Sequence, residues 1–397
     1  MIKRIFFPIG QGAFYAEKHD QFNIVYDCGN YRKTKLSEDI VKQSFNKNDD
    51  IDILFISHLD WDHISLLKTL KESVNSIRKV ILPLLHNDIK ILLKNIYHSL
   101  GYSSLDIIDD PEKFFGDNTK IIYISPSENN RSNESGEEIT ISHDNNNLPS
   151  VINSGTAIKI RGYRDYWCFV PYNIKNKERI ENLKKELKKA GLDMQKLITD
   201  PDYAMRIIIG PRKDDLKKCY KSLEGKINEN SLVIYSGPIP RRTPPSSFIQ
   251  AHYTTNDNDY DNYDNYDNYD NYDNYDNYDY DNYDYYYYYP YYFDLRASGC
   301  IYTGDVDLNK FDIKYVYKQF WNTVGTVQIP HHGSIKNFEE SFLKNNGHPL
   351  ICPISYGIRN SYGHPSLNVV NNISLNGSFV IHITEDSGSK YIQLIDF

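Results

Sequence analysis

The sequence predicts an α/β protein, on three observations. Short apolar runs of strand type alternate with segments whose apolar residues have helical spacing, the pattern of a sheet covered by helices. A composition of 40% hydrophobic and 25% charged residues is ordinary for a globular chain that buries a sizeable core. Polar residues stand repeatedly at the ends of the apolar runs. The length of 397 residues allows one large domain with insertions, or two or three domains.

The N-terminal segment is predicted to form a hairpin with strands at residues 5–9 and 23–30, ending in the turn Asp27-Cys28-Gly29. Glycine suits a turn with positive φ or a close approach of the backbone to a site, and this segment contains Gly10, Gly12 and Gly29. No helix or third glycine of a nucleotide-binding fingerprint follows them. We interpret Asp27 as a turn residue or a carboxylate beside the site rather than as a ligand.

Strands and helices then alternate up to residue 125. Helices are expected at 37–46, 63–76 and 88–100, the last of them ending at Gly101. Strands are expected at 53–56, 79–85 and 120–125. Residues 126–148 are polar and rich in Asn, Ser and Glu, which is typical of an exposed loop.

Residues 151–173 again have strand character, and two highly charged amphipathic helices are expected at 175–190 and 214–227. We predict that residues 174–227 form a helical insertion within a single domain spanning 1–397. Such an insertion is either a lid over one end of the sheet or a group of solvated packing helices.

A low-complexity Tyr/Asp/Asn segment occupies residues 253–294, with its regular repeat over 256–289. A period of three fits neither helix nor strand, and its aspartates repel one another, so we expect a disordered loop. Replication slippage is an alternative to a binding role for such a repeat. The loop separates two apolar runs that we expect to be neighbouring strands, 232–235 and 300–303.

The strongest chemical signal follows the predicted strand 53–56, where a strand-to-helix turn carries four potential metal ligands within six positions, His58, Asp60, Asp62 and His63. Alternate residues of an extended segment point the same way, and the helix start turns the last histidine toward them from another side. Capping and surface roles explain one aspartate but not two histidines and two aspartates together.

Three later apolar runs also end in polar residues. The run 300–303 leads to Gly304-Asp305, the run 327–329 to Pro330-His331-His332-Gly333-Ser334, and 354–356 to a turn with His364. Strand ends at one sheet edge bring such side chains together, so we expect Asp305 and the two histidines to join the 58–63 turn. Each alone would be an ordinary turn or capping residue.

Charge, cysteine content and apolar runs limit the function classes. The formal charge is −8, but residues 253–294 hold twelve aspartates and no lysine or arginine, so the rest of the chain carries +4. This permits an anionic substrate without indicating nucleic acid. Five scattered cysteines favour reduced thiols in a cytoplasmic protein. No run is long enough for a membrane span, so we expect no membrane role.

In order, the motifs resemble the metallo-β-lactamase-fold domain of ComEC-type DNA-uptake proteins and their soluble relatives, over residues 5–366. They are Gly10-Gln11-Gly12, Asp27-Cys28-Gly29, Ser57-His58-Leu59-Asp60-Trp61-Asp62-His63, Asn230-Ser231-Leu232-Val233, Thr303-Gly304-Asp305, His331-His332-Gly333-Ser334 and Tyr362-Gly363-His364-Pro365. The resemblance implies an αββα sandwich with a metal site at one sheet edge, and a hydrolase. Departures are Asp60 where the common signature has a second histidine, and Ile64-Ser65 where glycines are usual.

The resemblance also implies roles for residues. His58 and Asp60 would hold one divalent ion, Asp62 and His63 a second, and Asp305 would bridge them. His331 and His332 remain alternatives for the last ligand, with His332 favoured by alignment to the usual Pro-Gly-His-Gly form. The carboxylate at 60 favours Mn²⁺ or mixed occupancy, with Zn²⁺ as the alternative. His364 would contact the phosphate or protonate the leaving oxygen, and Ser334, Asn230 and Ser231 are candidates for orienting substrate.

Three functions are compatible with these residues. The first is a metal-dependent phosphodiesterase or nuclease that acts through a metal-activated water, with Asp62, Asp60 and His364 as its catalytic residues. The second is hydrolysis of a small ester, lactone or amide, because a fold does not fix its substrate. The third is a non-enzymatic scaffold whose metal braces the fold while the Tyr-rich segment recruits partners. The sequence carries no indication of oligomeric state.

Overall fold

The computed structural model describes most of the chain. The described residues are 1–102, 106–127, 137–141, 148–160, 167–175, 177–222, 230–240, 248–254, 297–344 and 346–396. The predicted low-complexity segment 253–294 lies outside them from residue 255 onward. Its first two residues, Tyr253 and Thr254, end a strand.

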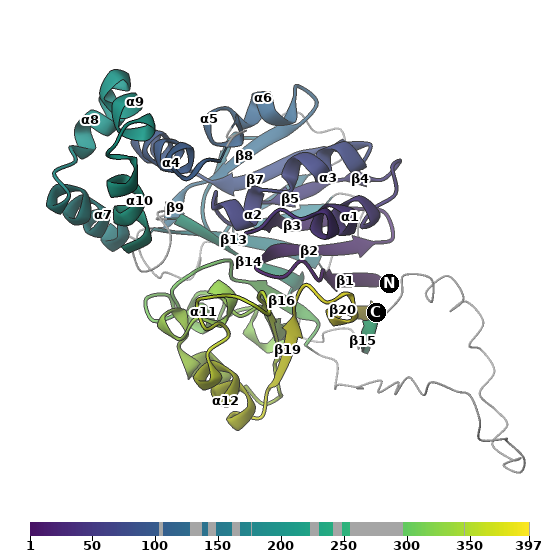
Figure 1. Cartoon of the computed structure of the whole chain (residues 1–397). Helices are drawn as coiled ribbons and strands as arrows, with labels where there is room; N and C mark the ends of the chain where they lie inside the picture. Colours follow the sequence, from purple (N-terminus) through teal and green to yellow (C-terminus); the bar gives the residue numbers. More distant parts are fainter. Residues whose placement is uncertain are drawn as a thin grey trace, which may run out of the picture.

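Two large mixed sheets dominate the fold (Figure 1). The first has the strand order β11 (Val151–Ile152), β8 (Lys120–Ile124), β7 (Lys79–Pro83), β5 (Ile53–Phe55), β3 (Asn23–Asn30), β2 (Gly12–His19), β1 (Ile2–Phe6), β20 (Lys390–Asp396) and β15 (Phe248–Thr254). The second has the order β10 (Glu138–Ile141), β12 (Ala157–Ile160), β13 (Trp167–Lys175), β14 (Asn230–Pro238), β16 (Gly299–Tyr302), β17 (Val324–Val327), β18 (Ile351–Ser355) and β19 (Phe379–Ile383), with β9 (Pro126–Ser127) beside β13. A small third sheet pairs β4 (Asp50–Ile51) with β6 (Ser76–Ile77).

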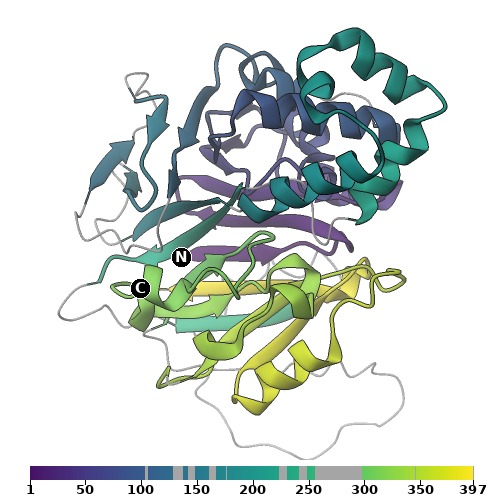
Figure 2. The same cartoon turned by 90° about the vertical axis from the view of Figure 1, so that its left-hand side faces the viewer.

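Helices cover the outer face of each sheet (Figures 1 and 2). Those over the first sheet are α1 (Lys35–Gln43), α2 (Trp61–Ile64), α3 (Leu67–Ser73), α4 (Asn87–Leu100), α5 (Asp106–Asp109) and α6 (Pro111–Phe115). Beside α4 lie α8 (Met194–Thr199), α9 (Pro201–Ile209) and α10 (Lys213–Ser222), and α7 (Lys177–Lys189) packs against α8 and α10. Over the second sheet lie α11 (Ile313–Val316) and α12 (Leu367–Leu375), with short 3-10 turns η3 (Trp321–Thr323), η4 (His331–Gly333), η5 (Ile335–Asn337) and η6 (Glu340–Leu343); η7 (Ser387–Ser389) precedes β20.

The core forms three apolar clusters, which define the layers. One lies between the first sheet and its helices, and includes Leu54, Leu92 and Leu216. The second lies between the two sheets, where Tyr26 and Tyr302 stack with ring centroids 3.7 Å apart. The third lies under the helices of the second sheet, around Tyr317. Helix, sheet, sheet and helix thus form four layers, and the predicted αββα sandwich of the metallo-β-lactamase fold is confirmed.

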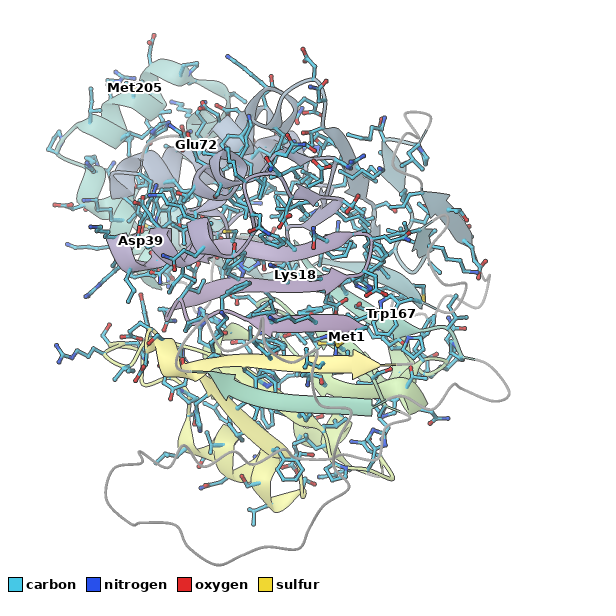
Figure 3. The ribbon with its side chains drawn as sticks, turned by 90° about the vertical axis from the view of Figure 1, so that its right-hand side faces the viewer. Met1, Lys18, Asp39, Glu72, Trp167 and Met205 are labelled. Atoms are coloured by element: carbon cyan, nitrogen blue, oxygen red, sulfur yellow. The ribbon has the colours of Figure 1, made fainter. Side chains whose placement is uncertain are left out.

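The two ends of the chain meet in the first sheet. β1 pairs antiparallel with β20, with Ile2 opposite Ile395, and β20 pairs with β15. In Figure 3 β20 and β15 lie directly beyond β1, which is marked by the label of the preceding residue Met1, while Met205 marks the outer helices at the far end. The sequence prediction did not include β15, β19 or β20.

The order of central elements agrees with the sequence prediction, and the predicted pairing of 232–235 with 300–303 is confirmed by β14 and β16, in which Ile234 lies opposite Tyr302. The single helix predicted at 63–76 is wrong. α2 ends at Ile64 and α3 begins at Leu67, because the amide of Leu66 donates to the carbonyl of Cys28 in β3 instead of continuing the helix. This bond ties the turn to the sheet.

Two other expectations are corrected. The segment 126–148 is not entirely loop, because β9 and β10 lie within it and Ile141 is buried. The predicted helix 175–190 begins at Lys177 since β13 extends to Lys175. The predicted helix 214–227 is described over Lys213–Ser222 as α10, and the rest of that prediction lies outside the described residues. α8 and α9 were not predicted, and Leu197 and Ile207 join the core cluster that includes Leu92 of α4.

Among the described residues, no helix is both long and apolar enough to cross a membrane.

Candidate metal centre

The turn after β5 carries four buried candidate ligands. His58, Asp60, Asp62 and His63 are each at most 2% exposed. Asp60 is the N-cap residue of α2 in extended conformation, and Asp62 and His63 lie in the single helical turn that follows. The change from extended chain to helix therefore brings side chains from both segments to one place, as the spacing predicted.

Two more candidate ligands come from the second sheet. Asp305 follows β16, and its Oδ2 lies 3.5 Å from Nε2 of His58 while its Oδ1 lies 3.4 Å from Nε2 of His63. His332 follows β17, and its Nε2 lies 3.2 Å from Oδ2 of Asp62. The structure thus brings the ends of strands in both sheets together at one edge of the sandwich.

The side chains form two overlapping groups with the geometry of cation sites. In each, the potential ligand atoms lie within 4.8 Å of one another: His58, His63 and Asp305 in one, and Asp62, His63 and His332 in the other. Asp60 adjoins the first group, with its Oδ2 3.6 Å from Nε2 of His58. The Asp305 carboxylate faces both histidines of the turn, and His63 belongs to both groups.

The donor set fits a metal on its own chemistry. The Nε2 atoms of His58 and His63 are buried and make no hydrogen bond to any described residue. Each instead faces carboxylate oxygens at 3.4 to 3.6 Å, too far for a good hydrogen bond. Buried polar atoms without partners are costly, and imidazole and carboxylate groups around a shared space are the usual ligands of Zn²⁺ and Mn²⁺.

Asp27 holds the ligand histidines from behind. Its Oδ1 accepts from the amide of Ser57 at 2.7 Å, and its Oδ2 accepts from the Ser57 hydroxyl at 2.6 Å and pairs with Nδ1 of His63 at 2.8 Å. The Ser57 hydroxyl also lies 2.8 Å from Nδ1 of His58. A partner on Nδ1 leaves Nε2 for a metal and fixes the orientation of the ring. Asp27 thus lies beside the candidate ligands, and its contacts to Ser57 also fit the alternative of a turn residue.

Two further contacts to the ligands were missed from the sequence. The hydroxyl of Tyr97 in α4 donates to Oδ1 of Asp60 at 2.8 Å, and the carbonyl of Ser355 in β18 lies 2.8 Å from Nδ1 of His332. Tyr97 belongs to the apolar face of its helix, so the only signal was a phenol within an otherwise aliphatic stripe. A backbone carbonyl leaves no signal in the sequence.

Unusual backbone angles gather at this site. The described non-glycine residues with left-handed φ are Asp27, His331 and His332, at 53°, 49° and 57°. Such conformations cost free energy and concentrate where function requires a fixed geometry.

Two nearby carboxylates shift the pKa of His63 strongly. Burial lowers the pKa of His63, but the carboxylates of Asp27 and Asp305 outweigh burial and raise the pKa to about 10. The negative charge of the carboxylates therefore favours a positive charge at Nε2 of this ring. A divalent cation bound there would balance the same negative charge.

His331 and His364 lie outside the ligand cluster. Nδ1 of His331 lies 2.9 Å from Oδ1 of Asn337, and its ring centroid lies 5.9 Å from that of His364. The geometry therefore brings His332, and not His331, to Asp62. Burial, followed by the nearby His332, lowers the pKa of His364 to about 4, so its ring is neutral near pH 7.

The three candidates for orienting substrate have different surroundings. Ser334 is buried directly after η4, and its amide donates to the carbonyl of His331. Ser231 is buried behind the ligands, where its Oγ would lie 2.7 Å from a Cβ added to Gly304. The side chain of Asn230 lies outside the described part of the structure.

Glycines allow the hairpin to approach the ligand turn. A Cβ on Gly29 would lie 2.5 Å from the carbonyl carbon of His63, and one on Gly12 would lie 2.9 Å from the carbonyl oxygen of Asp62. The predicted close approach of the backbone at these glycines is therefore found. Ser65, where the family pattern has a glycine, turns away from the site, and its hydroxyl accepts from the amide of Asn30 and donates to its carbonyl.

Comparison with known proteins gives one family match. Residues 10–106, which include the 58–63 turn, match the model of the metallo-beta-lactamase superfamily. No curated protein sequence matches the chain. The structure is similar to human tRNase Z, short form, at 9% identity and a TM-score of 0.35, covering 96% of this chain and 92% of that chain. It is also similar to the metallo-beta-lactamase fold protein YhfI from Bacillus subtilis, at 9% identity and a TM-score of 0.17, covering 44% and 55%.

Fold and site together define a class. The chain has the metallo-β-lactamase αββα sandwich, with a cluster of histidines and carboxylates at the sheet edge where its strand ends converge.

Proposed function

We propose that the chain is a metal-dependent hydrolase that cleaves phosphodiesters, with nucleic acid as the substrate class. The observation that carries the proposal is the position of Asp305, whose two carboxylate oxygens face His58 and His63 at 3.5 and 3.4 Å. A carboxylate between two sets of imidazole and carboxylate ligands suits a pair of divalent ions.

Each residue has a proposed role. His58, Asp60 and Asp305 would hold one ion, and Asp62, His63, His332 and Asp305 the other. When bound, such a pair supplies an activated water and neutralises charge on the oxygens of the reacting group. Asp60 stands in place of a histidine, so the set of ligands is rich in oxygen, and this favours Mn²⁺ over Zn²⁺.

His364 is proposed to bind substrate rather than to donate a proton. Its pKa of about 4 leaves the ring neutral at pH 7, so it can donate one N–H to a phosphoryl oxygen but carries no additional proton for the leaving group. Ser334 is retained as a candidate for orienting substrate because it follows η4 directly.

The proposal is tested on purified full-length chain with bis-p-nitrophenyl phosphate, plasmid, single-stranded DNA and a panel of lactones, each with Mn²⁺ and with Zn²⁺. We expect phosphodiester cleavage that Asp62→Ala abolishes while the circular dichroism spectrum is unchanged. Cleavage of lactones alone would favour the small-ester alternative. Undiminished cleavage by Asp62→Ala would remove the proposed site.

Deletion of residues 256–289 separates the enzyme from the scaffold alternative. A hydrolase should keep its turnover after the deletion. A scaffold that recruits partners through this segment should show no turnover in the intact chain, and the deletion should abolish its recruitment of partners.

A further inference from the structure

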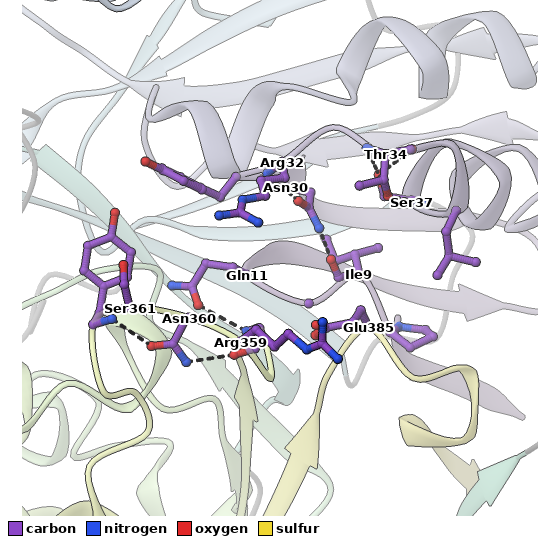
Figure 4. A pocket seen from close by; sticks show the side chains of 16 residues that line it. Ile9, Gln11, Asn30, Arg32, Thr34, Ser37, Arg359, Asn360, Ser361 and Glu385 are labelled. Carbon is purple, nitrogen blue, oxygen red and sulfur yellow. Dashed lines mark hydrogen bonds between the residues drawn. The ribbon is translucent and has the colours of Figure 1, made fainter.

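A pocket of about 250 Å³ adjoins the metal centre and has no role in the function proposed above. It lies between the loop after β1, the segment after β3 and the loop that follows β18 (Figure 4). Gln11 joins its walls, because its side chain accepts from the amide of Gly357 at 3.1 Å and its carbonyl accepts from the amide of Tyr31 at 2.7 Å.

Pocket residues are connected to the candidate metal centre at two places. On one side, Gly29 packs against the backbone of Asp62 and His63, and the chain reaches Tyr31 and Arg32 of the pocket within three residues. On the other side, Tyr362 of the pocket stacks on His364, with ring centroids 6.0 Å apart. Tyr362 therefore places the pocket next to His364, the residue proposed to bind substrate.

Two arginines give the pocket its charge. Arg32 and Arg359 are both exposed, and neither forms a salt bridge with any described residue. The one carboxylate in the lining, Glu385, accepts from the amide of Ile358 at 2.9 Å. Figure 4 shows the side chains of Arg32, Arg359 and Glu385 around the opening. Two guanidinium groups against one carboxylate favour an anion, and guanidinium matches phosphate in geometry.

Two tyrosines give the pocket an aromatic wall. Tyr31 and Tyr362 are 40% and 55% exposed and meet edge to face, with ring centroids 6.3 Å apart. Exposed aromatic rings beside cationic groups are the arrangement that proteins use to bind single-stranded nucleic acid, in which bases stack on the rings while arginines contact the backbone.

We propose that this pocket binds the phosphate next to the scissile one in a single-stranded nucleic acid, through Arg32 and Arg359, while the flanking base stacks on Tyr362. The inference rests on the proposed phosphodiesterase function and adds a subsite that sets substrate length and form. A paired strand does not fit this arrangement, because its bases are stacked within the duplex.

The test compares a single-stranded decamer with bis-p-nitrophenyl phosphate, which has no neighbouring phosphate. The quantity compared is kcat/KM for the decamer divided by kcat/KM for the small ester. We expect Arg32→Ala and Arg359→Ala each to lower this ratio about tenfold, because KM for the decamer rises. Each variant should also make the salt dependence of log KM for the decamer shallower by about 0.7. Lys35→Ala, which removes a nearby charge outside the pocket, should leave the ratio unchanged.

Two more variants test the parts of the pocket separately. Glu385→Gln should lower KM for the decamer, because it removes the one negative charge and keeps an acceptor for the amide of Ile358. Tyr362→Leu should raise the Kd of a fluorescein-labelled phosphorothioate decamer, measured by anisotropy, about 5- to 150-fold.

The results distinguish failure of this inference from failure of the proposed function. If the wild-type chain cleaves both substrates and the arginine variants keep the wild-type ratio, the pocket proposal alone is overturned. It is also overturned if duplex is cleaved with a lower KM than the single strand. If the chain cleaves neither substrate in Mn²⁺ or Zn²⁺, the phosphodiesterase proposal fails as well. Unchanged melting temperatures of the variants exclude misfolding as the cause of an effect.

Discussion

At the scale of single residues, the geometry of the candidate metal centre depends on the groups that hydrogen-bond to the candidate ligands as much as on the candidate ligands themselves. Tyr97 donates to Asp60, Asp27 binds Ser57 and His63, and the Ser355 carbonyl faces His332. Each of these contacts fixes one side of a candidate ligand, and the other side could then face a cation.

Tyr97→Phe should lower metal affinity about 10- to 100-fold, because Asp60 loses the donor that orients it. The fold should be retained, since the ring still packs in the apolar cluster between α4 and the first sheet. The measurement is a competition titration with a chromophoric chelator. Tyr356→Phe, which removes an exposed hydroxyl that pairs only with His382 among described residues, serves as the control. Equal affinity in the two variants would show that Tyr97 does not support the site.

Asp27→Asn should weaken metal binding by a similar factor of about 10 to 100. The carboxylate accepts from the backbone N–H and the hydroxyl of Ser57 and also pairs with Nδ1 of His63. The neutral side chain of asparagine cannot make all three contacts and lacks the negative charge. The same chelator titration measures it. Wild-type affinity in Asp27→Asn would assign Asp27 to the turn alone.

The sequence predicted the ligand candidates better than their supports. The candidates from His58 to His63 were evident because four potential ligand residues within six positions are rare, and Asp305 and His332 because they follow apolar runs. Tyr97 and Ser355 depend on how α4 and β18 pack, which no local pattern records. Geometry also separates His331 from His332, which the sequence left as alternatives.

At the scale of elements, the site depends on how closely the hairpin of β2 and β3 approaches α2. Gly12 and Gly29 permit this contact, and the bond from Leu66 to Cys28 ends the first helical turn. Apolar periodicity through Leu66, Leu67 and Leu70 suggested one continuous helix. The break has a tertiary cause, so periodicity alone could not predict it.

Gly29→Ala should destabilise the chain by about 1 to 3 kcal/mol and weaken metal binding, because the new methyl group overlaps the backbone of Asp62 and His63. Urea unfolding and the chelator titration measure the two effects. Gly377→Asn, at an open position with φ of 73°, should cost less than about 1 kcal/mol. If Gly29→Ala binds metal as the wild type does, the close approach does not position the ligands.

At the scale of the whole molecule, a buried polar network joins the two sheets. Arg4 of β1 pairs with Glu17 of β2 at 2.8 Å and donates to the Ser298 carbonyl before β16. Glu17 also accepts from Ser236 of β14 at 2.6 Å and Tyr302 of β16 at 3.0 Å. Arg4 and Glu17 are fully buried, and their sequence separation from the second sheet made the contact unpredictable.

Glu17→Gln should destabilise the fold by about 3 to 5 kcal/mol, because it leaves the Arg4 guanidinium buried without its counter-charge. Replacing both residues by methionine should cost much less, since no buried charge is left unpaired. Guanidinium unfolding of the two variants measures the difference. A double variant less stable than Glu17→Gln would contradict this account of the network.

The same pair predicts a dependence on acid. Burial raises the pKa of Glu17, but Arg4, with help from His19 and the Ser236 hydroxyl, outweighs burial and lowers the pKa from 4.5 to about 2. A carboxyl whose pKa is lower in the folded state stabilises the fold above pH 4.5, and the contribution is lost as the pH falls toward 2. The stability difference between wild type and Glu17→Gln should therefore shrink over this range. A difference that stays constant from pH 6 to pH 2 would contradict the assignment.

The central claim is that side chains from distant strand ends share one pair of divalent ions, and metal analysis of the dialysed chain tests it most directly. The wild type should retain about two Zn²⁺ or Mn²⁺ ions per chain, and Asp305→Ala should retain fewer because the residue that faces both sets of ligands is gone. A wild-type chain without bound metal, or an Asp305→Ala chain with the full wild-type content, would contradict the claim.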